Sequence, residues 1–254
     1  MMRRRTQGII VIVCFTWLAA ACSIWVEQPR GSLVLTFDDT VHIGSWKTGI
    51  NTIEQYGGVA TFFLDRPHRL SSSDVEWLLE IESRGHEIGF HGTHHGNAMM
   101  MVYFDGLCLD EYIAREIEPG VNQLRDMGLS ISSFAYPYGH HSASIDEALR
   151  HQFTVLRGVT PLAMWAVEPY GRSGFYKAAS MDVHADGREH ISMSAIRRAM
   201  RVARALDHAF ILYGHDTPDV DRDMAVPLAR LEAILSEAVA LGLGFKTMSQ
   251  LAEP

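Results

Sequence analysis

Short β-rich hydrophobic runs alternate with longer amphipathic stretches along most of the chain. The runs predict seven strands, at 32–37, 59–64, 86–91, 131–137, 153–159, 209–215 and 244–251. Apolar residues that recur every three to four positions predict helices at 45–57, 71–85, 110–128, 142–152, 192–208 and 224–242. Pro119 predicts a kink or break in the third of these helices, and the segment from Thr160 to His190 is less regular.

Strands that alternate with helices predict right-handed β-α-β units and a mostly parallel sheet. Seven such units suit a closed α/β barrel better than an open sheet. No internal repeat, low-complexity tract or linker divides the region. The chain has 254 residues, of which 47% are hydrophobic, and this is enough for one large domain with a full core. We therefore expect a single domain over residues 32–254, preceded by a short tether at 22–31.

Residues 1–21 have the pattern of an export signal. The basic stretch "MMRRRTQ" precedes the apolar "GIIVIVCFTWL", and the small residues "AAAC" follow. A cysteine after three alanines resembles the lipobox of bacterial lipoproteins, which predicts cleavage before Cys22 and acylation of its thiol. Leu18 departs from that pattern, because it lies four residues before Cys22 instead of three. The expected location is the cell envelope, with a lipid anchor to a membrane.

Two other interpretations of this segment stay open. Cleavage at the alanines 19–21 would release a periplasmic or secreted protein. Without cleavage, residues 9–26 approach the length of about 20 residues that a membrane-spanning helix needs. Cys14 lies in the signal and Cys22 would carry lipid, so Cys108 has no intrachain disulfide partner.

The charge balance excludes one class of partner. The chain carries 22 basic and 30 acidic residues, a formal net charge of −8. Loss of residues 1–21 would remove three arginines and no acid, which leaves −11. An acidic surface repels phosphate backbones, so we expect no binding of nucleic acid. No protein partner can be inferred from the sequence.

Acids and imidazoles recur where predicted strands end. Asp38 and Asp39 follow the first strand, and His215 ends the strand at 209–215. The segments "HGTHHGN" and "YPYGHH" follow the third and fourth strands. Because the loops at the carboxyl ends of parallel strands converge, these residues are expected to form one site.

Histidine and aspartate are both ordinary ligands of a divalent metal. His91 and His95 are four residues apart, so on one helical turn they would face the same ion. One carboxylate of the Asp38–Asp39 pair would supply a third ligand, which leaves the open position that a catalytic zinc needs. A cation would also relieve the repulsion between the two carboxylates. Each pattern alone is common in caps, turns and cores, but together they favour metal-assisted hydrolysis.

The segments "TFDDT", "HGTHH", "FAYPYG" and "ILYGHD", in this order and spacing, resemble the signature segments of polysaccharide deacetylases. These are the NodB-homology domains of the family 4 carbohydrate esterases. The resemblance covers residues 32–250. It implies a distorted (β/α) barrel of about seven strands, in agreement with the pattern above. It also implies a divalent metal cofactor, for which we expect zinc.

The resemblance implies a role for each matched residue. The metal ligands would be Asp39, His91 and His95. Asp38 would be the general base that activates the attacking water, and His215 the general acid that protonates the leaving amine. The backbone N–H of Tyr138 would help to hold the oxyanion. Residues implied to contact the substrate are Tyr136, Pro137 and Gly139.

Three positions depart from the family pattern. Thr40 stands where the first motif usually has Gly, and Gly92 replaces the usual Ser or Thr. Ala135 replaces the arginine that commonly orients the base. Candidates for a replacement cation are Arg157, Arg172 and Lys177.

The Asp-Trp fourth motif of the family has no clear counterpart. The nearest segment is "SMDVHAD" at 180–186, whose Asp182 is a candidate to polarise His215. Other histidines near the motifs are expected to be structural, neighbouring or exposed rather than ligands, namely His86, His94, His140 and His141.

The leading functional hypothesis is a metal-dependent hydrolase that removes N-acetyl groups from a glycan containing N-acetylglucosamine, in the cell envelope or outside it. The same chemistry would allow an O-acetyl esterase or a hydrolase of small cyclic amides. A third hypothesis, motivated by Ala135 and the missing fourth motif, is a glycan-binding protein that has lost catalysis.

Overall fold

Seven parallel strands close into a barrel in the computed structural model, which describes residues 29–171, 174–218 and 222–253. In spatial order the strands are β1 (Ser32–Asp38), β2 (Ala60–Leu64), β3 (Glu87–Phe90), β4 (Ser133–Ala135), β5 (Val155–Thr160), β7 (Phe175–Ser180) and β8 (Ala209–Gly214). Strand β8 pairs in parallel with β1 over six residues, and this pairing closes the barrel. The predicted fold class, an α/β barrel of seven parallel strands in one domain, is confirmed.

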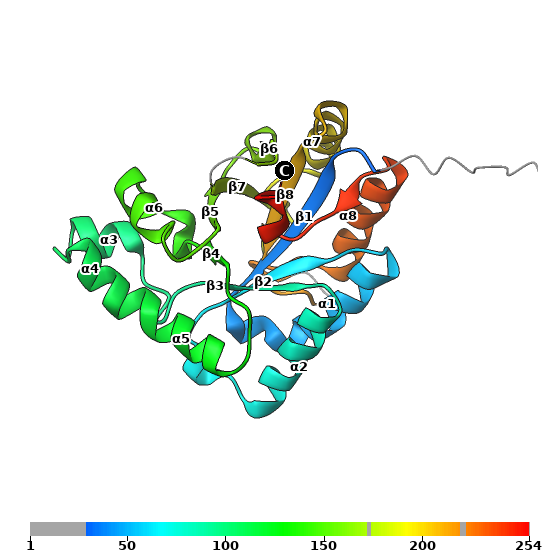
Figure 1. Ribbon diagram of the computed structural model, residues 1–254. Coiled ribbons are helices and arrows are strands. Elements are labelled where there is room, and N and C mark those ends of the chain that lie inside the picture. The colour runs from blue at the N-terminus through cyan, green and yellow to red at the C-terminus, as the bar shows by residue number, and fades with distance from the viewer. Residues whose placement is uncertain (1–28, 172–173, 219–221, 254) are drawn as a thin grey trace, which may run out of the picture.

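Helices surround the barrel, as Figure 1 shows. They are α1 (Ile43–Gln55), α2 (Ser72–Ser83), α3 (Ala98–Tyr103), α4 (Leu109–Tyr112), α5 (Glu118–Asp126), α6 (Ala143–Leu149), α7 (Met193–Leu206) and α8 (Leu228–Ala240). A π-helical turn at Ile113–Ile117 joins α4 to α5 just before Pro119. The helical stretch predicted at 110–128 is therefore interrupted beside that proline, as expected from its missing N–H.

The last predicted strand, at 244–251, is wrong in most of its length. Only β9 (Gly244–Phe245) is extended, and it pairs with the first two residues of β1. The following 3-10 turn, Ser249–Leu251, packs Leu251 with the residues that line the barrel interior. The seventh place in the barrel belongs instead to β7, which lies in the segment expected to be irregular. A further short strand, β6 (Val167–Glu168), pairs antiparallel with β8.

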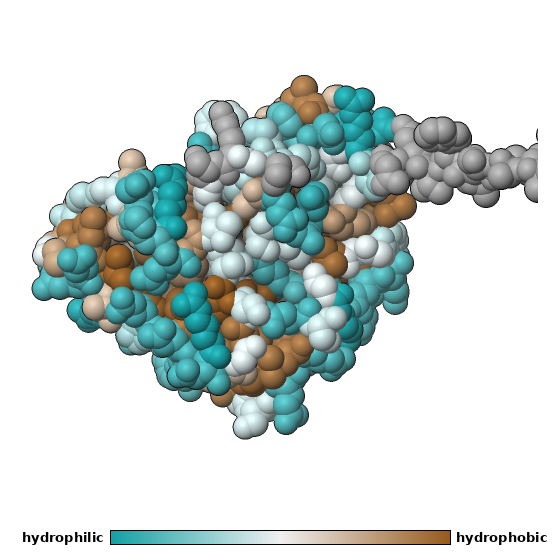
Figure 2. Space-filling model, in the orientation of Figure 1, coloured by the Kyte–Doolittle hydropathy of each residue, from teal (hydrophilic) through white to brown (hydrophobic). Residues whose placement is uncertain are grey.

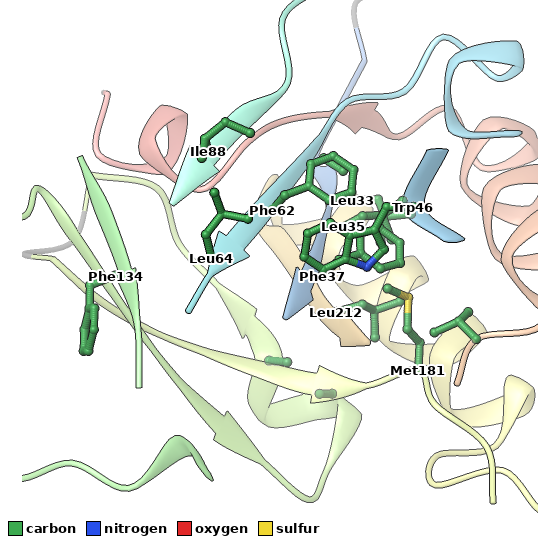
Figure 3. Packing of buried hydrophobic residues seen from close by; sticks show 14 of the residues in the cluster. Leu33, Leu35, Phe37, Trp46, Phe62, Leu64, Ile88, Phe134, Met181 and Leu212 are labelled. Carbon is green, nitrogen blue, oxygen red and sulfur yellow. The ribbon is translucent and has the colours of Figure 1, made fainter. Parts of the chain in front are cut away.

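Alternation along β1 divides the core into two layers. Leu33, Leu35 and Phe37 pack between the barrel and its helices, where Phe37 stacks on Phe62 with ring centroids 5.5 Å apart (Figure 3). Val34 belongs to the second cluster, inside the barrel. Side chains of a strand alternate between faces. The last residue of β1, Asp38, therefore shares the interior face with Val34 and is buried at the carboxyl end of the barrel.

The predicted signal, the expected acylation site Cys22 and most of the predicted tether lie outside the described residues. Within the described ranges, no helix is both long and apolar enough to cross a bilayer. Cys108 is an exposed free thiol. On the face shown in Figure 2, hydrophobic surface is visible over α3 and α4 as well as near the centre. Met100 in α3 and Phe104, which follows α3, are exposed.

Candidate metal and catalytic site

The chain turns sharply just after β1, at Asp39. Asp39 adopts a positive φ of 73°, so the chain leaves the strand and Asp38 and Asp39 point in different directions. Thr40 is held by Asp65, whose carboxylate accepts a hydrogen bond from the Thr40 N–H at 2.9 Å. Positive φ thus falls on Asp39 and not on Thr40, and this is why a β-branched residue is tolerated where the family usually has Gly.

The loop that carries the paired histidines is not helical, so the expected helical turn is wrong. Gly92 has φ 96° and His95 has φ 62°, and between them the chain reverses direction. The buried carboxylate of Glu116 accepts hydrogen bonds from the N–H groups of His94, at 3.1 Å, and Gly96, at 2.5 Å. A loop built around Glu116, rather than helical spacing, brings the rings of His91 and His95 to a centroid distance of 5.0 Å.

Asp39, His91 and His95 form a group with the geometry of a metal site. Their ligand atoms all lie within 4.8 Å of one another. Asp39 Oδ1 lies 3.1 Å from His95 Nε2 and 3.6 Å from His91 Nε2. Among the described residues this buried oxygen has no partner with good hydrogen-bond geometry. His91 Nδ1 donates to the Ala135 carbonyl at 2.8 Å, which leaves Nε2 free to bind. The donor set therefore fits a three-ligand divalent cation.

The charges in this group favour the ligand forms of the side chains. Burial raises the pKa of Asp39, but the close approach of His95 Nε2 and the other nearby imidazoles outweigh it, so the pKa is lowered overall. Burial lowers the pKa of His91, which disfavours the imidazolium. At neutral pH the site thus presents a carboxylate and a neutral imidazole, the forms that bind a metal.

Asp38 is paired with a cation from another strand. Arg157 Nη2 lies 2.5 Å from both oxygens of the Asp38 carboxylate, and both side chains are buried. Arg157 stands directly opposite Ala135 in the pairing of β4 with β5. Of the candidate cations, Lys177 is exposed on β7 and Arg172 lies outside the described residues. Arg157, one of the three candidate cations, therefore places a positive charge beside Asp38, across the strand pairing from Ala135.

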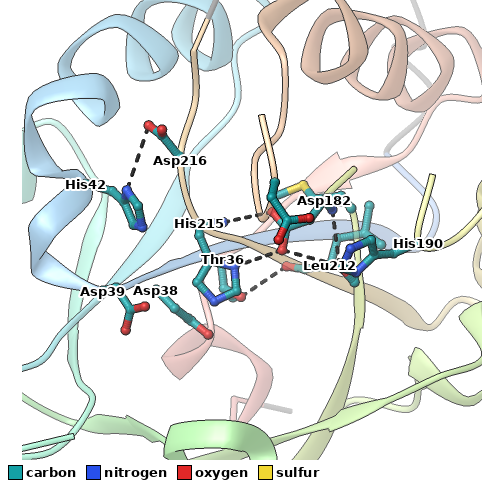
Figure 4. A network of polar contacts seen from close by, with 12 residues as sticks. Thr36, Asp38, Asp39, His42, Asp182, His190, Leu212, His215 and Asp216 are labelled. Carbon is teal, nitrogen blue, oxygen red and sulfur yellow. Dashed lines mark hydrogen bonds and ion pairs between the residues drawn. The ribbon is translucent and has the colours of Figure 1, made fainter. Parts of the chain in front are cut away.

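His215, just after β8, is oriented by Asp182. Its Nδ1 lies 2.8 Å from Asp182 Oδ2, and its backbone N–H donates to Asp182 Oδ1 at 3.1 Å (Figure 4). Burial opposes a charged imidazole. The hydrogen bond to Asp182 and the carboxylates of Asp182, Asp38 and Asp39 outweigh that effect and raise the pKa of His215 to about 9. His215 is consequently protonated at neutral pH.

The sequence comparison decides the family. Residues 26–156, slightly more than half of the chain, match the profile of the family described as Polysaccharide deacetylase. The chain belongs to the polysaccharide deacetylase family. The resemblance inferred from the four motifs is confirmed. No curated protein sequence matches the chain significantly.

Solved structures of polysaccharide deacetylases and related proteins share the fold. A T48 deacetylase with substrate is 19% identical and covers 87% of this chain and 90% of its own, with a TM-score of 0.56. A family 4 carbohydrate esterase from Streptomyces lividans in complex with acetate is 19% identical, with coverage of 85% and 92% and a TM-score of 0.54. A family 4 pseudoenzyme from Bacillus anthracis is 15% identical, with coverage of 88% and 66% and a TM-score of 0.58. At these identities the likeness establishes the fold.

The deacetylase-family motifs meet in one cavity of about 200 Å³. Its lining residues are Asp38, Asp39, His91, His95, Tyr136, Tyr138, Gly139, Arg157, Val159, Tyr213, His215 and Met224. All of the residues predicted as metal ligands, base, acid and oxyanion donor are among them. Pro137, a predicted substrate contact, is not among them, and it is buried. Tyr138 has φ 61° and a side chain that is mostly exposed.

Sequence reasoning missed the cavity residues Val159, Tyr213 and Met224. Tyr213 flanks the Arg157 guanidinium, whose central carbon is 5.2 Å from the ring centroid. Tyr213 lies two residues before His215 in the segment "ILYGHD". Because side chains alternate along a strand, this spacing indicates that both residues face the same side. Met224 lies in the sequence between β8 and α8, and nothing in its local sequence marks it.

The remaining candidate histidines lie outside the metal group. His94 is mostly exposed and its ring contacts Glu116, while His140 is near Asn97. His141 stacks on Phe175 with ring centroids 4.0 Å apart. The expectation that His94 is a neighbour and not a ligand agrees with this geometry. His86, expected to be structural, is buried and accepts a hydrogen bond from the Ala60 N–H at 3.1 Å. None of these four histidines belongs to the group formed by Asp39, His91 and His95.

Proposed function

We propose that the protein is a metal-dependent deacetylase that removes N-acetyl groups from a glycan containing N-acetylglucosamine. The observation that carries the proposal is one cavity that contains a three-residue metal group together with a candidate base and a candidate acid. Each of these two groups is held by an oppositely charged side chain. Asp38 is paired with Arg157 in that cavity, and His215 is paired with Asp182 beside it. Family membership supports the reaction class.

The metal ligands in this proposal are Asp39, His91 and His95, and zinc is the preferred ion for two imidazoles and a carboxylate. A divalent cation held there would supply a Lewis acid that makes water a nucleophile at neutral pH. Asp38 takes the proton from the attacking water, and Arg157 fixes its carboxylate for that task. The backbone N–H of Tyr138 donates to the oxygen that becomes negative as the carbonyl is attacked.

His215 completes the reaction by protonating the leaving amine. An amine is a poor leaving group unless it gains a proton, so the acid must carry that proton at working pH. The raised pKa of His215, about 9, meets this requirement at neutral pH. Asp182 also fixes the ring through Nδ1, which leaves Nε2 as the proton donor. Asp38 and His215 therefore divide the roles of base and acid.

The size of the cavity supports a substrate whose acyl group enters while the polymer stays outside. About 200 Å³ is smaller than the sites that enclose whole ligands of drug size. A neighbouring groove shares Gly139 with the cavity and is lined by Asn97, Met99, Met100, Phe104, His140 and His141. In this proposal an acetamido group enters the cavity, and the sugar chain lies against the apolar and polar side chains of the groove.

The test is acetate release from N-acetylglucosamine oligomers by the purified protein loaded with zinc. Asp39→Asn and His95→Ala should lose the metal ion held by this three-residue group and reduce the rate to background. A matched control is His151→Ala, an exposed histidine outside the cavity, which should retain full activity. Full activity in the Asp39→Asn protein would contradict the metal role.

Hydrolysis of an O-acetyl ester or of a small cyclic amide would require the same catalytic groups. The need for the general acid His215 distinguishes ester hydrolysis from amide hydrolysis. An alcohol leaves more readily than an amine, so His215→Asn should reduce ester hydrolysis much less than amide hydrolysis. A panel of acetylated glycans and cyclic amides assigns the substrate class. If no substrate in the panel is hydrolysed and glycan binding remains, the protein is a binding protein that has lost catalysis. Arg157 and Asp182 argue against that outcome, because they replace the two features whose absence suggested it.

The location that suits this function is the cell envelope, with Cys22 acylated. A lipid anchor would hold the barrel beside peptidoglycan or an exopolysaccharide. Cys22→Ser should move the protein from the membrane fraction to the soluble fraction. An unchanged membrane fraction would favour an uncleaved anchor instead.

A further inference from the structure

The loops after β7 and β8 meet beside Asp182 and contain a second group of metal-binding side chains. An isolated bridge joins Val183 to Ala225, with the Val183 N–H donating to the Ala225 carbonyl at 2.8 Å. A second bridge joins Val183 to Glu189, which folds the first loop back on itself. These bridges place two segments, 183–190 and 223–225, side by side at the carboxyl end of the barrel.

His184, His190 and Asp223 lie in these segments, and their ligand atoms are all within 4.8 Å of one another. His184 Nδ1 is 3.5 Å from Asp223 Oδ1, and the two imidazole rings have centroids 4.2 Å apart. Two imidazoles and one carboxylate are the donor set of a borderline metal such as zinc. Among the described residues, only this group and the catalytic one have three ligand atoms so close together.

An ordinary ion pair does not account for the group. His184 and Asp223 have side chains that are 44% and 65% exposed, so their contact is worth little by itself. His190 Nε2 is buried and has no hydrogen-bond partner among the described residues. Such an atom costs free energy unless something binds it. A shared cation would engage this nitrogen together with His184 and Asp223.

We propose that His184, His190 and Asp223 form a second divalent-cation site, of the zinc class, which links the loop after β7 to the loop after β8. None of its three ligands belongs to the catalytic group, so the site can form whether or not the protein is a deacetylase. It borders a surface cavity lined by Ser180, His184, His190 and Tyr213, among others, which gives an ion and its water ligands access from solvent.

The position of this site gives the ion a structural consequence. The His190 N–H donates to the Asp182 carbonyl at 3.1 Å, and His190 Nδ1 is 3.4 Å from Ser180 Oγ. Ser180 Oγ in turn lies 3.4 Å from Asp182 Oδ2, and Figure 4 shows Asp182 between His190 and His215. A cation on His190 therefore stabilises the loop that holds the partner of His215.

The first test is the number of zinc ions per chain after equilibrium dialysis. The wild-type protein should bind two. The Asp39→Asn/His95→Ala protein should bind one, and His184→Ala/Asp223→Asn should also bind one. Asp186→Asn is the matched control, because Asp186 is an exposed carboxylate in the same loop that pairs with Arg188 instead. It should still bind two.

The second test is thermal unfolding in the Asp39→Asn/His95→Ala protein, in which the catalytic group cannot contribute. Zinc should raise its unfolding midpoint, magnesium should not, and adding His184→Ala and Asp223→Asn should abolish the zinc effect. The proposal is overturned if the Asp39→Asn/His95→Ala protein binds no zinc, or if its zinc count does not change on adding those two substitutions. Neither the zinc count nor the unfolding midpoint depends on deacetylase activity. A protein without that activity would therefore contradict the proposed function and leave the test of the second metal site unaffected.

Discussion

The buried pair of Asp38 and Arg157 provides the sharpest prediction. Arg157→Met keeps an unbranched apolar stem and removes the charged guanidinium. In the protein, Arg157 is fully buried, its Nη2 is 2.5 Å from both Asp38 oxygens, and Phe63 and Tyr213 lie 5.2 Å from its guanidinium carbon. The substitution therefore leaves the buried Asp38 carboxylate without the cation that contacts both of its oxygens.

The cost follows from that burial. Two unit charges about 4 Å apart interact by roughly 4 kcal/mol at an effective dielectric constant of about 20. Breaking a buried pair by removing one partner typically costs about 3–5 kcal/mol, because the other charge stays buried. We expect Arg157→Met to lower the free energy of unfolding by this amount. The catalytic rate should fall about 100-fold or more, because the base loses its orientation.

A double-mutant cycle separates the pair from other effects of the substitution. Urea unfolding is measured for Arg157→Met, Asp38→Asn and the double variant, and acetate release is measured beside it. Each single variant should be destabilised. The double variant should regain stability, because neither charge is then buried alone, but it should stay inactive. Recovery of stability without activity would show that the loss of activity is not a consequence of unfolding.

The matched control is Lys177→Met on the neighbouring strand β7. Lys177 is exposed, so its loss should change the free energy of unfolding by no more than about 0.5 kcal/mol. The reasoning is refuted if Arg157→Met unfolds within about 1 kcal/mol of the wild-type protein and releases acetate at the wild-type rate.

Three further predictions follow from the site. The pKa of His215, about 9 against an ordinary value of 6.5, means that its contribution to the stability of the metal-free protein is complete below about pH 6.5 and is lost as pH rises toward 9. Urea unfolding across this range should show the loss, and Asp182→Asn should remove it; an equal loss in that variant contradicts the assignment. Dialysis against a chelator should bring acetate release to background and added zinc should restore it, whereas activity that survives chelation excludes a metal role. Gly92→Ala should destabilise the protein by more than Gly106→Ala, because both have positive φ but only at position 92 would a new Cβ lie 2.8 Å from Glu116 Oε1. Equal costs in urea unfolding would show that backbone strain alone matters.

The fold was largely predictable because the barrel strands carry local hydrophobic patterns. The strand prediction at 32–37 differs from β1 by one residue, and the prediction at 209–215 also differs from β8 by one. The pattern failed for β7, whose sequence "FYKAAS" has an exposed lysine and small residues. It also failed at 244–251, where an apolar segment packs against the barrel interior as a turn. A short apolar run shows burial, but it does not identify the surface that buries it.

The motif residues lie together in one cavity, as their positions after the strands indicated, but the residues that hydrogen-bond to them were not predictable. The roles of metal ligand, base and acid stay predictions. The helical turn assumed for His91 and His95 was wrong, because a spacing of four is equally compatible with a reversing loop built around Glu116. Among three candidate cations for Asp38, nothing in the local sequence favoured Arg157.

What the sequence by itself determined is therefore local: where strands end, which side chains follow them, and which family the motifs resemble. What only the tertiary structure decided is pairing between distant segments. Asp38 and Arg157 are 119 residues apart, and they meet because β4 and β5 place Arg157 opposite Ala135 inside a closed barrel. Hydrophobic periodicity is a property of neighbouring residues, whereas strand register and barrel closure depend on the packing of the whole chain. The groups that orient the catalytic residues were settled by that packing.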